Sequence, residues 1–197
     1  MKRTIAALCA TAFLVLAAVP PGQAQSRKED LERIVRMEGE SLDDRERATM
    51  RYMLQVHKMA RDVYLQYFDL WKVGIFSELA HEKQLNMDAM LELMSKYDLP
   101  PQVKPEEFGQ FPDRKFSKQY SNFLQTGRLS MFEALRAAGT IENLCLFDAS
   151  NRMDRTDNRD LRRAYGLFMQ EARDNLQRIK KVLNLYGEKI GQDIWMF

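Results

Sequence analysis

Apolar side chains recur every three or four residues along four long stretches of the chain, and glycine or proline bounds most of these stretches. This spacing places the apolar residues on one face of an α-helix. The sequence therefore predicts four long amphipathic helices at residues 42–72, 76–97, 130–150 and 158–186. Two shorter helices are predicted at residues 26–37 and 116–126, and no strand-like alternation of useful length is present.

Several helices are expected to begin at a serine that is followed three residues later by an acid, because this pair satisfies free backbone amides. The pairs are Ser26 with Glu29, Ser41 with Asp44, and Ser130 with Glu133. The expected helix stops are Gly39, Gly74, the Pro100-Pro101 pair and Gly187.

A proline-rich segment separates the second long helix from the third. Residues 99–114 contain four prolines, with Phe108 and Phe111 between the last two. We expect an ordered crossover loop pinned by these aromatic rings. Four helices with one long connection form the ferritin-like arrangement. The predicted fold class is therefore all-α, with a short N-terminal helix at 25–40 and a ferritin-like four-helix bundle at 41–188.

The first 24 residues have the three parts of a secretory signal peptide. Lys2 and Arg3 precede an apolar run, and the small residues Gly22 and Ala24 follow it. A membrane anchor is the alternative, but a run of about 15 residues falls short of the roughly 20 that span a bilayer. We expect cleavage after Ala24 and a periplasmic or secreted protein with no membrane span. Residues 189–197 form an apolar tail that needs a surface to pack on.

Composition excludes several classes of partner and site. Without Lys2 and Arg3, the 30 basic residues fall to 28 and equal the 28 acidic residues, so nothing in the net charge favours nucleic acid or an anionic membrane. Cys145 is the only cysteine beyond the signal peptide, which rules out an internal disulfide. No catalytic triad signature, phosphate-binding glycine loop or Cys-x-x-Cys motif is present.

Six short segments resemble a bacterial and archaeal family of ferritin-like proteins catalogued as domain of unknown function 2202. Together they cover roughly residues 50–185, in matching order and spacing. The segments are Ala60-Arg61-Asp62-Val63-Tyr64-Leu65, Met87-Asp88-Ala89-Met90, Lys96-Tyr97-Asp98-Leu99-Pro100, Gly127-Arg128-Leu129-Ser130, Ala134-Leu135 with Ile141-Glu142, and Thr156-Asp157-Asn158. The family has no agreed activity, so the resemblance implies a fold more directly than a function.

The resemblance also implies a di-metal site of inward-facing carboxylates and histidines, because two adjacent cations need bridging oxygens and nitrogen ligands. This chain departs from that ligand pattern at nearly every position. Gln55-Val56-His57 replaces an acidic run, and Lys83 and Asn86 replace a Glu-x-x-His pair. Glu142 is kept, while Cys145 and Asn175 stand where an acid and a histidine are usual. We therefore expect no cofactor.

The replaced positions still fall on the apolar faces of their helices. They predict a buried polar layer of His57, Lys83, Asn86, Glu142, Cys145 and Asn175. Because an unpaired buried charge is costly, we expect the Lys83 ammonium to pair with Glu142, with Asn86 and Asn175 completing the hydrogen bonds. In the alternative, Lys83 extends outward along its methylenes to a surface acid.

A metal site can also be assembled from other residues. Glu78 and His81 form a new Glu-x-x-His pair, and Glu82, Glu142, Glu171 and Asp174 could add oxygens, with iron or manganese as the metal. Helical phase directs Glu78 and His81 toward solvent, so an exposed face is the preferred interpretation. A lone His57, the recurring methionines and Cys145 on an apolar face are more typical of core packing than of ligands or a reactive thiol.

These observations leave three functional hypotheses. The first is a metal-free, non-catalytic protein that binds an unknown protein partner or has a structural role outside the cytoplasm. The second is an iron- or manganese-dependent oxidoreductase or metal-binding protein with a rearranged ligand set. The third is an envelope protein that self-associates through the tail, in which Ile194, Trp195 and Phe197 would form an apolar patch.

Overall fold

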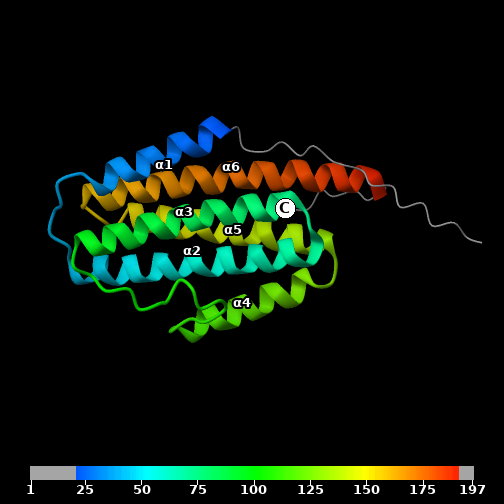
Figure 1. The fold of residues 1–197 in the computed structure, drawn as a ribbon, viewed down its shortest axis with the longest axis horizontal. Coiled ribbons are helices and arrows are strands. Elements are labelled where there is room, and N and C mark those ends of the chain that lie inside the picture. The colour runs from blue at the N-terminus through cyan, green and yellow to red at the C-terminus, as the bar shows by residue number, and fades with distance from the viewer. Residues whose placement is uncertain (1–20, 191–197) are drawn as a thin grey trace, which may run out of the picture.

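The computed structural model describes residues 21–190, with side chains for residues 25–187, and the regular secondary structure of this part of the chain is all helical (Figure 1). The all-α prediction is therefore confirmed. The six helices are α1 (Pro21–Val35), α2 (Asp44–Trp71), α3 (Gly74–Lys96), α4 (Arg114–Gly127), α5 (Met131–Met153) and α6 (Arg159–Ile190).

Four long helices, α2, α3, α5 and α6, pack side by side around a common core. The closest pairings are α2 with α3 and α5 with α6, joined by contacts of α2 with α5 and of α3 with α6. The helix α1 lies against α3 and α6, and α4 packs on α2 and α5 on the opposite side of the molecule (Figure 1). Both short helices thus cover outer faces of the four long ones.

The residues predicted on the apolar faces form this core. They include the methionines that recur at helical spacing, since Met50, Met53, Met87, Met90 and Met94 are all fully buried. Unbranched methionine side chains fill irregular gaps between helices. Their burial among leucine, alanine and aromatic neighbours confirms that they belong to the core.

The observed helix ends agree with the predicted capping and stop residues only in part. Ser130 accepts a hydrogen bond from the Glu133 amide at the start of α5, as expected. At α2 the prediction was wrong, because Asp43 caps the helix and Glu46 bonds back to the Asp43 amide. The observed pair lies two residues after the predicted one. Either pair satisfies free backbone amides at the start of a helix, so the two starts differ little in free energy.

Two further predicted boundaries are wrong. The helix α1 begins at Pro21, so Ser26 lies inside it, and the expected cleavage position after Ala24 also falls within α1. The helix α6 continues through Gly187 to Ile190. A glycine permits a helix stop but does not impose one when the flanking residues are good helix formers. Residues 1–20 of the predicted signal peptide and residues 191–197 of the predicted apolar tail lie outside the described residues.

The segment between α3 and α4 is ordered by an ion cluster on α2. The Lys58 ammonium donates to the Glu107 carbonyl at 2.5 Å, and Arg61 donates to the Pro105 carbonyl at 2.6 Å. Asp62 binds both cations, at 2.7 Å from Lys58 and 2.6 Å from Arg61, and also accepts from the Gly109 amide. This connecting segment is therefore held by buried charge as well as by the predicted aromatic packing.

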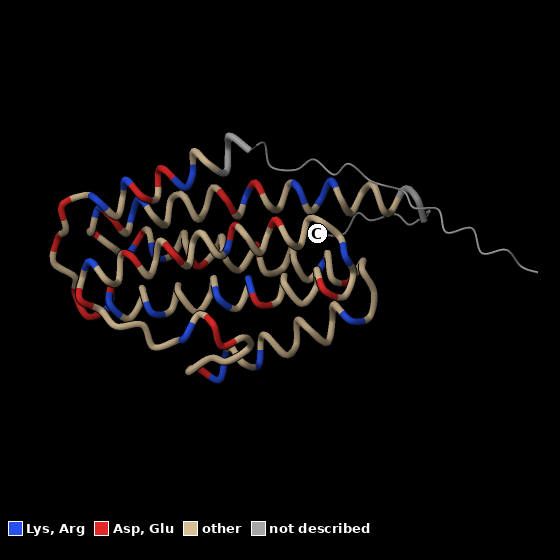
Figure 2. The backbone as a smooth tube through the Cα atoms, viewed as in Figure 1, with Lys and Arg blue, Asp and Glu red and all other residues tan. Residues whose placement is uncertain are grey.

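Charge on most of the described helices is mixed in sign. Basic and acidic residues are interspersed along α1, α2, α3, α5 and α6, whereas α4 carries only the basic residues Arg114, Lys115 and Lys118 (Figure 2). No described helix is both long enough and apolar enough to span a bilayer.

Candidate functional site

A buried ion cluster lies between α3, α5 and α6. The Lys83 Nζ atom, from α3, donates to Glu142 Oε2 on α5 at 2.7 Å and to Glu171 Oε2 on α6 at 3.0 Å. Lys83 and Glu142 are fully buried and Glu171 is 2% exposed. Lys83 therefore lies in the position expected for a pair with Glu142, and it also has a second carboxylate partner.

Neighbouring polar groups complete the hydrogen bonds of the two carboxylates. Asn86 and Asn175 donate to Glu171 at 3.1 and 2.6 Å, and the Tyr64 hydroxyl donates to Glu142 at 2.7 Å. We call these six residues the Lys83 layer: Tyr64, Lys83, Asn86, Glu142, Glu171 and Asn175. All four long helices contribute to it, so its hydrogen bonds fix their relative positions.

His57 and Cys145 also lie in the interior, as predicted. The His57 ring packs edge-on against Phe168, with ring centres 4.6 Å apart, and neither nitrogen has a hydrogen-bond partner among the described residues. Burial and the nearby Lys83 charge lower the pKa of His57 to about 3, so its ring is neutral. Burial raises the pKa of the Cys145 thiol, which keeps it protonated and unreactive.

The two carboxylates of the Lys83 layer differ in their affinity for a proton. Burial raises the pKa of Glu142 to about 7, and the attraction of Lys83 offsets this only in part. Burial also opposes ionisation of Glu171, but Lys83 and Arg27 outweigh it and lower the pKa of Glu171. Burial likewise opposes the charge on Lys83, yet its acidic neighbours raise its pKa, so it stays an ammonium.

A second group of charges borders the Lys83 layer near α1. Arg178 donates to Glu82 at 3.1 Å and to the side-chain oxygen Oδ1 of Asn175 at 2.9 Å, and it also pairs with Glu78. Arg27 of α1 lies 3.8 Å from Glu82. These contacts link the short N-terminal helix to the buried polar residues.

The alternative metal ligands are not brought together. His81 is exposed, Glu78 is engaged by Arg178, and Glu142 lies in the interior bonded to Lys83. Within residues 21–190, no three histidine, cysteine, aspartate or glutamate side chains converge as a metal site would require. The orientation of Glu78 and His81 away from the core agrees with their helical phase.

The Lys83 layer also does not fit the di-metal site that the family resemblance implies. A di-metal site places cations between carboxylates of facing helices. Here a protein ammonium already lies within 3.0 Å of both Glu142 and Glu171, and Asn86 presents its amide nitrogen to Glu171 as a donor. Donors directed at the carboxylates compete with a metal ion for the same lone pairs.

Sequence reasoning considered Glu171 only as an oxygen ligand in the alternative metal site and assigned neither Glu171 nor Tyr64 to this layer, although both carried a usable signal. Glu171 precedes Asn175 by four residues and thus shares its helix face. Tyr64 was expected in the core, and a buried tyrosine hydroxyl normally needs a hydrogen-bond partner. Lys58 and Asp62, which hold the segment between α3 and α4, carried no such signal, because charged residues are rarely fully buried.

Comparison with known proteins places the chain in a family. The chain is 33% identical over 157 residues to the uncharacterized protein MJ0754 of Methanocaldococcus jannaschii, covering 80% of this chain and 85% of that protein. Its structure matches the crystal structure of the hypothetical protein MJ0754, with a TM-score of 0.75 and 32% identity over 77% of this chain and 86% of that chain. Residues 46–193 also match the family model described as an uncharacterized protein domain, DUF2202. The chain therefore belongs to the DUF2202 family.

Proposed function

We propose that this protein is an exported, metal-free and non-catalytic member of its family that acts as a binding or structural protein. In this proposal the four long helices form a ferritin-like bundle, and the Lys83 ammonium supplies the positive charge that metal ions supply in di-metal bundles. The partner is another protein or a second copy of the chain.

The observation that supports the proposal is the position of the Lys83 ammonium between two buried carboxylates. Glu142 and Glu171 come from facing helices and would repel each other without a cation between them. Lys83 lies 2.7 Å from Glu142 and 3.0 Å from Glu171. Tyr64 donates to the other Glu142 oxygen, while Asn86 and Asn175 donate to Glu171 Oε2 and Oε1. Two carboxylates paired in this way hold the helices together.

The proposal of export rests on the N-terminal sequence pattern. Its test is the mass of the protein recovered from the periplasm or medium of the cells that produce it. A chain that begins at Gln25 supports export, and a full-length chain in the cytoplasm opposes it. Cleavage at that point would leave residues 25–35 of α1, which carry the buried Leu31 and Ile34.

Metal analysis of the wild-type protein tests the central claim. The protein is purified without added metal or chelator, and iron and manganese are measured per chain by elemental analysis. We expect well below one equivalent of either metal. About two atoms per chain, the number that paired-carboxylate bundles hold, would overturn the proposal.

A designed variant tests the same claim from the other direction. Lys83→Glu together with Asn86→His would create a Glu-x-x-His pair on α3 facing Glu142 and Glu171, the combination that binds metals in such bundles. We expect this double variant to gain iron or manganese after incubation with the metal. Lys83→Met is the matched control, since it removes the ammonium without adding ligands. Equal metal content in the double variant and the wild type would count against the proposal.

A further inference from the structure

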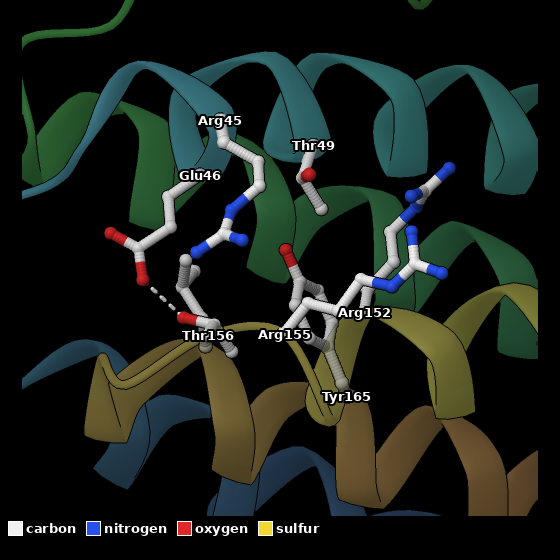
Figure 3. Close-up of a pocket in the computed structure, with 8 residues that line it drawn as sticks. Arg45, Glu46, Thr49, Arg152, Arg155, Thr156 and Tyr165 are labelled. Carbon is white, nitrogen blue, oxygen red and sulfur yellow. Dashed lines mark hydrogen bonds between the residues drawn. The ribbon is translucent and has the colours of Figure 1, made fainter.

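A separate pocket opens where the start of α2 faces the end of α5 and the start of α6 (Figure 3). Its cavity volume is about 50 Å³. Three arginines line it, Arg45 from α2, Arg152 from α5 and Arg155 from the turn after α5, together with Thr49 and Tyr165. None of these residues belongs to the Lys83 layer.

The Tyr165 hydroxyl is the most unusual group in the pocket. The Tyr165 side chain is fully buried, and its hydroxyl has no hydrogen-bond partner among the described residues. In Figure 3 the hydroxyl points up into the pocket, toward Thr49 and Arg45. A buried hydroxyl is normally hydrogen-bonded, so this one marks a place where a donor is available to a ligand.

The three arginines have few partners of their own. Arg155 is exposed and makes no side-chain hydrogen bond or ion pair with another described residue. Arg152 stacks on Tyr52 at 4.1 Å and lies 3.7 Å from Asp148, which leaves its buried Nε without a hydrogen bond. Arg45 has only a 3.5 Å contact with Asp43.

The one carboxylate in the pocket is already engaged. One oxygen of Glu46 accepts from the Asp43 amide, and the other accepts from the Thr156 hydroxyl (Figure 3). Glu46 thus fixes the segment after α5 against the start of α2 and does not satisfy the guanidinium groups. The pocket keeps an excess of positive charge over negative.

We propose that this pocket binds a small oxyanion, either free phosphate or the carboxylate of a small acid, with the Tyr165 hydroxyl and the Arg152 Nε as buried donors. Arg45 and Arg155 supply further charge from the rim. Guanidinium groups match the geometry of phosphate and carboxylate oxygens. The cavity admits one such group and is too small for a nucleotide.

Calorimetric titration of the full protein tests the proposal. Inorganic phosphate and acetate are each titrated at constant ionic strength, with chloride as the background anion. We expect saturable binding of at least one of them. Saturation by phosphate only identifies a tetrahedral ligand, and saturation by acetate identifies a carboxylate. Saturation by neither would overturn the proposal.

Two variants locate the binding within the pocket. Tyr165→Phe removes one buried donor and should weaken binding about tenfold, the effect of losing one charge-assisted hydrogen bond. Arg155→Gln should weaken binding and make the dissociation constant less sensitive to salt, and its exposed position leaves folding intact. The matched control is Arg173→Gln, an exposed arginine further along α6.

The control should bind as the wild type does. If Arg155→Gln and Tyr165→Phe both retain wild-type affinity, the anion binds elsewhere and the proposal fails. The melting temperature gives a second readout, because a ligand bound only to the folded state raises it. The bound anion should raise the melting temperature of wild type and Arg173→Gln more than that of Arg155→Gln.

Discussion

At the scale of single residues, Lys83 decides the charge balance of the core. It is the one cation that contacts both Glu142 and Glu171 in the Lys83 layer. Breaking a buried ion pair by removing one partner leaves uncompensated charge in a medium of low polarity. The carboxylates cannot turn to water, because both are almost completely buried.

Lys83→Met should therefore lower the free energy of unfolding at pH 7 by about 3–5 kcal/mol. The change keeps the apolar stem and removes only the ammonium. Urea denaturation measures the effect, and Lys118→Met on the exposed face of α4 is the control, with an expected change within about 0.5 kcal/mol. Adding Glu142→Gln to Lys83→Met should restore part of the loss. Equal stability of Lys83→Met and Lys118→Met would show that Lys83 is not paired in solution.

Glu142 and Glu171 should affect the pH dependence of stability in opposite directions. The pKa of Glu142 is raised from 4.5 to about 7, so the folded protein holds this proton more tightly than the unfolded chain. Its contribution is fully present below pH 4.5 and is lost as the pH rises to about 7, by up to about 3 kcal/mol. The pKa of Glu171 is lowered, so its contribution is present above pH 4.5 and is lost as the pH falls.

Urea denaturation between pH 4 and 8 separates the two carboxylates. Relative to wild type, Glu142→Gln should gain stability as the pH rises from about 4.5 to 7. Glu171→Gln should lose stability relative to wild type as the pH rises from 4 to 5. Parallel curves for the wild type and Glu142→Gln would show that Glu142 titrates normally.

Helical phase alone was enough to place Lys83, Asn86, Glu142 and Asn175 inside, because each shares a face with apolar neighbours. It could not show that Lys83 bridges two carboxylates. That depends on the distance between α5 and α6, which no single-helix pattern contains. The pocket around Tyr165 was missed for the same reason, since its residues meet only after three segments are packed together.

At the scale of elements, the segment between α3 and α4 depends on Asp62. This fully buried carboxylate receives Lys58, Arg61 and the Gly109 amide. Gly109 has a φ of +68°, and a β-carbon there would approach Tyr120 to 2.7 Å. The backbone at Gly109 is therefore fixed both by the conformation that glycine permits and by the Asp62 carboxylate on α2.

Asp62→Ala should increase the mobility of the segment between α3 and α4, because it leaves Lys58 and Arg61 buried without their shared anion. We expect a loss of about 3–5 kcal/mol and faster proteolytic cleavage within residues 102–111. The control is Asp69→Ala, which breaks an exposed pair with Lys72 and should cost under about 1 kcal/mol. Unchanged cleavage in Asp62→Ala would assign the order of this segment to its aromatic residues alone.

Element positions followed from sequence more reliably than element ends. The apolar spacing predicted all six helices, but their ends depend on alternatives that lie close in energy. Asp43, and not Ser41, caps α2. The helix α6 continues past Gly187, where the sequence predicted its end. The burial of Lys58 and Asp62 was not predictable, because besides each other they bind backbone groups far along the chain.

At the scale of the whole molecule, α1 belongs to the folded unit although it precedes the region that the family model covers. Its Leu31 and Ile34 are 4% and 6% exposed, and its Arg27 reaches Glu82 beside the Lys83 layer. The helix thus shields the polar interior on the side of α3 and α6.

Leu31→Ala should lower the free energy of unfolding by about 2–4 kcal/mol, as expected for truncating a buried leucine. Hydrogen exchange should speed up in α1 and in the facing turns of α3 and α6. Arg33→Ala on the exposed side of the same helix is the control, with a change within about 0.5 kcal/mol. A loss of protection restricted to α1, with no change in global stability, would show that α1 docks as a separate unit.

The covalent attachment of the Lys83 ammonium to α3 has a consequence for how the molecule is made. A charge carried by a side chain arrives with the nascent polypeptide and cannot be withdrawn by a chelator or displaced by a competing ion. Refolding from urea should therefore proceed at the same rate and to the same yield with or without EDTA. Under the proposed metal-free function, the core of this protein should also assemble in surroundings where transition metals are scarce.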